Sequence, residues 1–241
     1  MEKKQPLFCP PPYQDSASFG RLILRDGSTA SIHIATPKDQ EALRDFFERL
    51  SPESRYQRFF SFRLPDDQLM ATLCDSSHPR KGLTLIVTRI IEGAPRIIAT
   101  GSYVLTEPKK AEVGVVAADQ FQGKGLATLL LERLSLLAVR NGILRFQAVT
   151  HADNRRMLEI FQHSGFTLEQ QANQGLIDIE LSVQPGEASV ARSELRDRVY
   201  TTASLLPFFR PNAVAVIGAS RKESSLGFMV VESLMTNRFQ G

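Results

Sequence analysis

Apolar residues along the chain recur at two spacings, one typical of strands and one typical of helices. Residues 21–35 alternate between apolar and polar on both sides of an Asp-Gly dipeptide suited to a tight turn, which predicts a β-hairpin. Residues 82–91 and 96–106 are apolar runs joined by a short turn, and a third run begins near Glu112. These three runs predict a three-stranded meander.

Other segments have apolar residues three or four positions apart, and most of them begin at a capping residue or a proline. The predicted helices cover residues 36–50, 51–62, 66–74, 126–140 and 154–164. A strand over residues 143–150 follows the fourth helix, so this strand and the Glu112 strand should be parallel, with a right-handed connection. Two more strands, over residues 166–168 and 176–183, complete the pattern.

The stretch Ala111–Ala127 is the centre of this pattern, because it joins a buried strand to a leucine-rich helix through two glycines. Gly123 and Gly125 have no Cβ that would keep a ligand away from the backbone. The amides of the turn and of the first helical turn also have no intrahelical partners. Such a turn is suited to bind a phosphate group.

The chain divides into four parts. Residues 1–19 are polar and proline-rich and predict a disordered lead, whereas residues 20–183 hold the predicted strands and helices of one domain. Residues 184–204 carry mixed charges without a long apolar run, and we expect a linker with at most one short helix. Structure is expected to resume over residues 205–241.

Composition narrows the classes of protein. The chain of 241 residues is 42% hydrophobic and 23% charged, as in a soluble globular protein with ample core. Its net charge of +3 argues against dedicated nucleic-acid binding but is compatible with an anionic ligand. Cys9 and Cys74 give no disulfide framework, and neither a signal peptide nor a membrane-spanning stretch is visible. We therefore expect a cytoplasmic protein that binds neither membranes nor a metal.

The turn Gln122–Ala127 fits the pattern Q/R-x-x-G-x-G/A, the pyrophosphate-binding turn of the Gcn5-related N-acetyltransferases, and the chain resembles this GNAT family. Glu112, a helix led by Asn154 and the Gly165-Phe166 pair that closes it also stand where the family would have them. The resemblance implies an α/β (α+β) fold with a mixed, mostly antiparallel twisted sheet of about seven strands flanked by helices. It also implies acetyl-CoA as the co-substrate.

The resemblance also assigns functional roles to the residues of this sequence that match the family's motifs. The resemblance implies that the turn and the residue after it hold the CoA pyrophosphate and that two strand residues contact the thioester arm through their backbone. These residues are Gln122, Gly123, Lys124, Gly125, Leu126, Ala127 and Thr128 in the turn, and Val115 and Val116 in the strand. Lys124 would add charge to this cradle or would simply be solvated. Asn154 would bind the pantetheine arm, although capping of its helix explains it equally well.

Glu112 is the candidate general base, by resemblance to family members whose strand begins with the same Ala-Glu-Val. A partly buried glutamate beside apolar strand residues would have a raised pKa that suits this role. The alternative is a solvated acid at the strand end that pairs with Lys109 or Lys110. The family's usual general acid, a tyrosine before the Gly-Phe pair, is replaced by Phe161 here, and His151 and His163 are nearby.

Residues 50–60, LSPESRYQRFF, resemble a segment of bacterial GNAT domains that acetylate lysines of acyl-CoA synthetases. Two interpretations stay open for this amphipathic helix. Its aromatic residues would be core and Arg55 and Arg58 would form a solvated face, or the helix would contact the substrate.

Residues 205–241 resemble the opening strand and loop of the CoA-binding domain in NDP-forming acyl-CoA synthetases. An apolar strand, Val214–Ile217, leads to a candidate second nucleotide or CoA loop formed by Gly218, Ala219 and Ser220, and a helix follows over residues 225–237. A lone strand–helix unit cannot bury a strand that is apolar on both faces. We therefore expect this chain to be the N-terminal piece of a fusion with a synthetase.

The resemblance thus implies an acetyl-CoA-dependent N-acetyltransferase that transfers an acyl group to a primary amine, with Glu112 as the general base for direct attack by the amine. The expected acceptor is a protein lysine, for example one of an acyl-CoA synthetase. A small-molecule amine is the alternative acceptor. An alternative of another class is a non-catalytic acyl-CoA-sensing module that regulates a fused synthetase.

Overall fold

A single eight-stranded sheet organises the protein, with the strand order β1-β2-β3-β4-β5-β6-β8-β7. The computed structural model describes residues 19–184, 186–211, 213–237 and 239, so the predicted lead over residues 1–19 lies outside the described residues except for its last position. The strands are β1 (Phe19–Ile23), β2 (Thr29–Ile34), β3 (Gly82–Ile91), β4 (Ala94–Glu107), β5 (Lys110–Ala117), β6 (Arg145–His151), β7 (Thr167–Asn173) and β8 (Leu176–Ser182).

Strand pairing follows the predicted hairpin and meander. β1 and β2 pair antiparallel around Gly27, whose φ of +78° is readily adopted by glycine. β3, β4 and β5 pair antiparallel in sequence order, and β5 and β6 form the parallel pair. The mostly antiparallel sheet is therefore confirmed, with eight strands in place of about seven.

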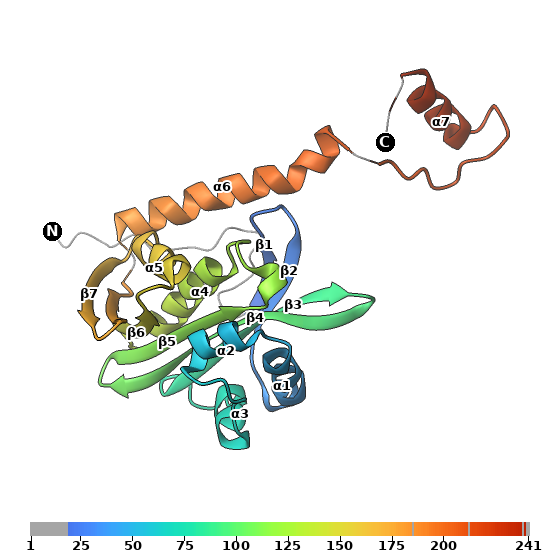
Figure 1. Cartoon of the computed structure of the whole chain (residues 1–241). Coiled ribbons are helices and arrows are strands. Elements are labelled where there is room, and N and C mark those ends of the chain that lie inside the picture. Colours follow the sequence, from blue (N-terminus) through green and yellow to red (C-terminus); the bar gives the residue numbers. More distant parts are fainter. Residues whose placement is uncertain (1–18, 185, 212, 238, 240–241) are drawn as a thin grey trace.

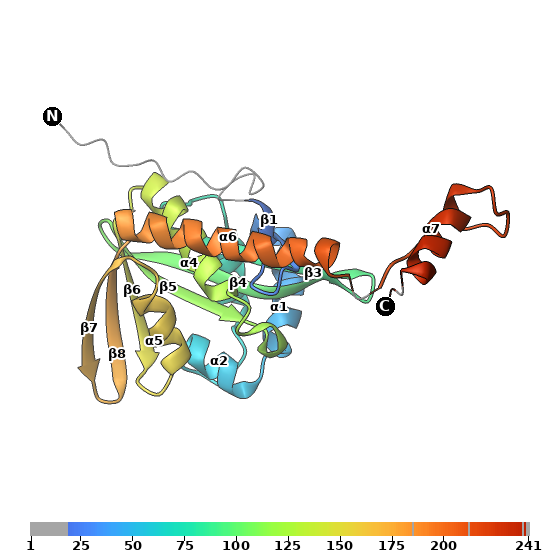
Figure 2. The ribbon, with the colours of Figure 1, turned by 90° about the horizontal axis from the view of Figure 1, so that it is seen from above.

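Helices cover both faces of the sheet. Figure 1 shows α1 (Gln40–Glu48), α2 (Pro52–Phe59) and α3 (Asp67–Cys74) on one side. On the other side lie α4 (Leu126–Arg140) and α5 (Arg155–Gln162), with α6 (Glu187–Phe209) running across α4, as the view from above in Figure 2 also shows. The leucines that predict α4 are buried in the core, and the helix ends before Gly142, whose φ is +82°.

The two faces of β5 meet different helices. Val115 shares its face with Leu130 and Leu134 of α4, because all three side chains surround the Cα of Gly101 on the neighbouring strand. Side chains alternate along a strand, so Glu112, Gly114 and Val116 lie on the opposite face, toward α2. This alternation decides which residues can meet in the site.

The region after residue 183 differs from the prediction. Residues 187–209, expected to be mostly linker, form the 23-residue helix α6, which is anchored by the buried ion pair between Arg196 and Glu132 of α4. Residues 214–217 form no strand in the described part of the chain, and Ile217 is 98% exposed, because no neighbouring strand is available to pair with them. The following helix is present as α7 (Leu226–Thr236), capped by Ser225.

Across the residues that the structure describes, no helix combines the length and the apolar character that a membrane span requires.

Candidate active site

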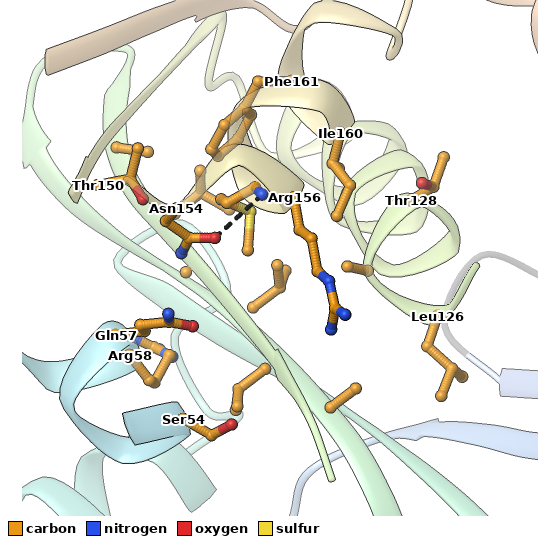
Figure 3. A pocket seen from close by; sticks show the side chains of 18 of the residues that line it. Ser54, Gln57, Arg58, Leu126, Thr128, Thr150, Asn154, Arg156, Ile160 and Phe161 are labelled. Carbon is orange, nitrogen blue, oxygen red and sulfur yellow. Dashed lines mark hydrogen bonds between the residues drawn. The ribbon is translucent and has the colours of Figure 1, made fainter. Parts of the chain in front are cut away.

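The site lies where two parallel strands part. β5 and β6 pair at three positions, of which the last joins Glu112 to Gln147, and beyond it the two strands separate. A cleft of about 1090 Å³ opens along β5 between this point and the glycine turn, bordered by α2, α4 and α5. Figure 3 shows side chains of these helices pointing into it. Beyond Glu112, the side of β5 that faced β6 therefore has no strand partner in the described structure.

The glycine turn forms one end of the cleft. Gly123 and Gly125 have φ values of +76° and +82°, a backbone region that glycine reaches without the strain a Cβ would impose. None of the backbone amides of residues 123–128 donates a hydrogen bond to another described residue. A Cβ at Gly123 would meet nothing within 4 Å, so this side of the turn is open to a ligand. The turn therefore offers a row of free donors, as a diphosphate requires.

The second glycine has a protein neighbour that the sequence analysis missed. A Cβ at Gly125 would overlap the hydroxyl of Tyr200, a residue of α6 that is 9% exposed and lines the cleft. Burial raises the pKa of the Tyr200 phenol, which therefore stays protonated. No local sequence signal links residue 200 to residue 125, because the contact depends on how α6 packs across α4.

Polar side chains hold the turn in place. The Gln122 side chain donates through Nε2 to Ser54 Oγ (3.0 Å) and accepts at Oε1 from Arg156 Nη1 (3.1 Å). The Lys124 ammonium donates to Asp26 Oδ2 of the β1–β2 turn at 2.8 Å. The Lys124 side chain is 30% exposed and paired with this carboxylate, and it does not line the cleft.

The remaining predicted donor-side residues also border the cleft. They are Val115 and Val116 of β5 together with Leu126, Ala127 and Thr128 at the start of α4. Both valines are 8% exposed and Leu126 is 2% exposed. Their side chains therefore serve mainly in packing, and only their backbone groups and the Thr128 hydroxyl can contribute polar contacts.

Glu112 lies at the other end of the cleft, at the point of strand separation, and also borders a smaller hollow of about 560 Å³. Its side chain is exposed, contrary to the expected partial burial. Lys110 pairs with Glu180 of β8 at 2.7 Å, and Glu112 forms no ion pair among the described residues. The structure therefore does not contain the alternative ion pair between Glu112 and Lys110.

Arg58 of α2 lies inside the cleft and is not on the predicted solvated face. Its Nη2 donates to Ser102 Oγ at 2.7 Å, and its guanidinium rests against the Cα of Gly114. Burial lowers the pKa of Arg58 to about 10, while the charge of Glu112 acts in the opposite direction. Arg55, by contrast, donates to the backbone carbonyls of Leu50 and Phe62 and serves the local fold.

Comparison with known proteins identifies this architecture. The family model described as an acetyltransferase (GNAT) domain matches residues 32–167, more than half of the chain. The chain belongs to the GNAT acetyltransferase family. Acetyl-CoA, which this family uses, is accordingly its co-substrate. No cluster of side chains able to hold a metal ion occurs among the described residues.

Individual relatives agree with this assignment. The chain is 30% identical over 145 residues to the acetyltransferase PA5475 of Pseudomonas aeruginosa, covering 59% of this chain and 77% of that protein. It is 27% identical over 179 residues to the acetyltransferase Pat of Mycolicibacterium smegmatis, covering 73% of this chain but only 52% of Pat. The chain thus spans about half the length of Pat.

Solved structures share the fold. The GNAT domain of S. lividans PAT is 29% identical, with a TM-score of 0.61, and the match covers 73% of this chain and 99% of that domain. The structure of yncA from Salmonella typhimurium with its cofactor acetyl-CoA is 20% identical, with a TM-score of 0.51, covering 67% of this chain and 98% of yncA. This second likeness concerns the fold alone.

The side chains at the α5 end of this GNAT cleft are of mixed kind. Asn154 caps α5 by accepting from Met157 N at Oδ1 (3.2 Å), and its side chain borders the cleft (Figure 3). Phe161 borders the cleft as well and is 4% exposed, so no phenol stands at this position. His163 donates from Nδ1 to the Glu159 carbonyl (2.8 Å) and is exposed.

His151 lies outside the lining of the cleft, between two aromatic rings of α2 and its C-terminal end. Its ring centroid is 5.2 Å from those of Tyr56 and Phe60, and its Nε2 is buried without a partner in the described structure. Phe62 stacks on Tyr56 at 4.6 Å, and Phe60 and Phe62 are 39% and 61% exposed. The interpretation that places Tyr56, Phe59 and Phe60 in the core is thus wrong for Phe60, which is exposed and lines the cleft.

The predicted second loop lies elsewhere. Gly218, Ala219 and Ser220 are exposed and do not line the cleft, and Ser220 Oγ accepts from Lys222 N (3.1 Å). Gly218 and Ala219 pack closely against Gly227 of α7. Their role as a nucleotide or CoA loop stays a prediction.

Proposed function

We propose that this GNAT protein transfers the acetyl group of acetyl-CoA to the side-chain amine of a protein lysine, with Glu112 as the general base. The observation that carries the proposal is that Glu112 occupies the last pair before β5 and β6 part, at the end of the cleft opposite the glycine turn. A donor held by the turn would therefore extend along β5 toward this carboxylate.

The donor side is supplied by backbone groups. The free amides of residues 123–128 would bind the diphosphate, and the edge of β5 that has lost its strand partner would bind the pantetheine arm near Val115 and Val116. The free amide nitrogen of Asn154 would add a contact to the same arm. These groups are held by the sheet and by α4 before any ligand arrives, which favours a defined thioester position.

The chemistry is direct transfer. The neutral amine attacks the thioester carbonyl carbon, and the C–N bond forms. When the tetrahedral intermediate collapses, the C–S bond breaks and the nitrogen loses its surplus proton to solvent, from which the departing CoA thiolate takes up one proton. Glu112 accepts the proton that the acceptor ammonium must lose before attack. Residue 112 lies four positions, or about 13 Å, before residue 116 along the strand, so a bridging water fits this transfer better than direct contact.

The surface beside the acceptor end supports a protein acceptor. The exposed rings of Phe60 and Phe62 form an aromatic patch with the partly exposed Tyr56, at the edge of the cleft that Phe60 lines. Such patches are typical of protein contacts. A lysine of an acyl-CoA synthetase as acceptor rests on the sequence resemblance of residues 50–60 alone. A small-molecule amine would use the same chemistry without the aromatic patch.

Glu112→Gln tests the base. We expect its kcat to fall by about 10²–10⁴, with acetyl-CoA binding within about twofold of the wild type, because the change removes a proton acceptor at the end remote from the turn. Glu107→Gln is the matched control, since Glu107 is an exposed glutamate at the end of β4 that does not line the cleft. Transfer is measured by thiol release and by mass spectrometry of a lysine-containing protein and of small amines.

Two results would oppose the proposal. Equal turnover of Glu112→Gln and Glu107→Gln would remove Glu112 as the base. Acetyl-CoA binding by the wild type without transfer to either class of amine would instead favour the acyl-CoA-sensing module.

A further inference from the structure

Arg58 occupies the midpoint of the cleft. One face of β5 carries Glu112, Gly114 and Val116. The Arg58 guanidinium lies over Gly114, which is two residues from Glu112 and two residues from Val116. If Glu112 handles the amine proton and the thioester arm lies near Val116, the amine and the carbonyl carbon meet over Gly114. We propose that Arg58 is a further catalytic residue of the transfer, whose guanidinium stabilises the negative charge that develops on the thioester oxygen.

Gly114 has a specific reason to lack a side chain. A Cβ on this residue would stand 2.5 Å from Arg58 Nη1 and 2.6 Å from Cζ, closer than any ordinary contact. The φ of Gly114 is not positive, so its backbone conformation does not by itself require glycine. The missing methyl group is therefore what lets the guanidinium lie flat on the strand at this point.

Most N–H groups of the Arg58 guanidinium have no hydrogen-bond acceptor among the described residues. Of its five N–H groups, one has a hydrogen bond, from Nη2 to Ser102 Oγ at 2.7 Å, and Nε is buried without a partner in the described structure. No carboxylate of the described residues lies within 4.0 Å of it. An N–H group that is shielded from water without an acceptor, as at Arg58 Nε, is costly, and an oxygen ligand in the cleft would supply an acceptor to this partly buried cation. The side chain is thus arranged to receive an oxygen from the cleft.

The same cation would act on the acceptor. A fixed guanidinium repels an incoming ammonium and leaves a neutral amine unaffected, so it favours the reactive form of the nitrogen. It therefore complements a base at Glu112. This inference rests on the proposed function, because it takes the thioester and the amine to meet between Glu112 and Val116.

Arg58→Met and Arg58→Lys test the charge, with Arg63→Met as the matched control on an exposed arginine. We expect Arg58→Met to lower kcat by about 10²–10³, the range for loss of one oxyanion donor, with acetyl-CoA binding within about twofold of the wild type. Arg58→Lys should recover about tenfold of this loss because it keeps a cation. Retention of at least half of the wild-type kcat in Arg58→Met would overturn the proposal.

Gly114→Ala tests the position of the charge without removing it. The new methyl group should displace the flexible end of Arg58 and lower kcat about tenfold in the wild type, yet change kcat less than twofold in the Arg58→Met background. Equal losses in both backgrounds would show that the methyl group acts elsewhere and would also overturn the proposal. Because Glu112→Gln reports on the base separately, an inactive Glu112→Gln with a fully active Arg58→Met defeats this inference alone.

Discussion

Replacing the two glycines of the glycine turn by alanine, one at a time, should produce two different losses of unfolding free energy. Gly123 and Gly125 both have φ near +80°, so alanine at either position meets the same backbone strain. Their surroundings differ, because a Cβ at Gly123 faces open space and a Cβ at Gly125 overlaps the Tyr200 hydroxyl. The pair therefore separates strain in the turn from its contact with α6.

The magnitudes follow from these two terms. Alanine in the left-handed region costs about 1–2 kcal/mol, which is the whole loss expected for Gly123→Ala. Gly125→Ala adds the overpacking against Tyr200, about 1–3 kcal/mol, for a total of about 2–5 kcal/mol. Acetyl-CoA binding should show the reverse order, since a methyl group at residue 123 stands on the open side of the turn. We expect the KM of Gly123→Ala for acetyl-CoA to rise at least about tenfold, equivalent to about 1.4 kcal/mol.

Urea unfolding gives the free energies, and initial rates at varied acetyl-CoA give KM. The control is Tyr200→Ala, made in the wild type and in the Gly125→Ala background. The difference between these two variants should contain only the backbone strain, so the overpacking part of the Gly125→Ala loss is recovered. Equal destabilisation by the two alanines, or no recovery in the double variant, would refute the contact between α6 and the turn as the source of the difference.

Two further predictions concern charges around the turn. Burial raises the pKa of Glu132 to about 7, and the charge of Arg196 opposes this rise. The unfolded chain binds the proton less tightly, so the contribution of protonated Glu132 to the unfolding free energy is complete below pH 4.5 and is lost as the pH rises through 7. Arg196→Met should therefore lower the unfolding free energy by about 3–5 kcal/mol at pH 8 and by clearly less at pH 5, measured in urea, and a loss independent of pH would contradict this. Lys124→Gln should change the KM for acetyl-CoA less than about threefold, because the ammonium is paired with Asp26 and such pairs contribute little; a tenfold rise in initial-rate assays would place Lys124 in the cradle instead.

Local patterns in the sequence predicted the elements that depend on near neighbours. The Asp-Gly hairpin, the meander and the strand–turn–helix around Gly123 all follow from turn residues and from the spacing of apolar positions, and all are present. The parallel β5–β6 pair follows as well, because a strand–helix–strand order leaves few other arrangements.

The predictions that failed concern residues whose conformation or burial depends on distant parts of the chain. Residues 187–209 show no apolar face of their own, and α6 is held by single contacts such as Arg196 to Glu132. Residues 214–217 are apolar enough for a strand, but pairing requires a neighbour that the described chain does not provide. In the sequence Arg58 could not be distinguished from a surface arginine, because its position in the cleft depends on Gly114, which is 56 residues further along the chain.

The glycines of this cleft therefore do three different things, although the sequence presents them alike. Gly123 leaves space for a ligand, Gly125 leaves space for a side chain of α6, and Gly114 leaves space for a side chain of α2. Two of the three spaces are filled by the protein itself, so a glycine in a phosphate-turn motif does not by itself mark where the ligand approaches. In the proposed function, the reaction is located by three features together: an open glycine at the turn, the separation of β5 from β6, and the Arg58 guanidinium that the missing Cβ of Gly114 admits between them.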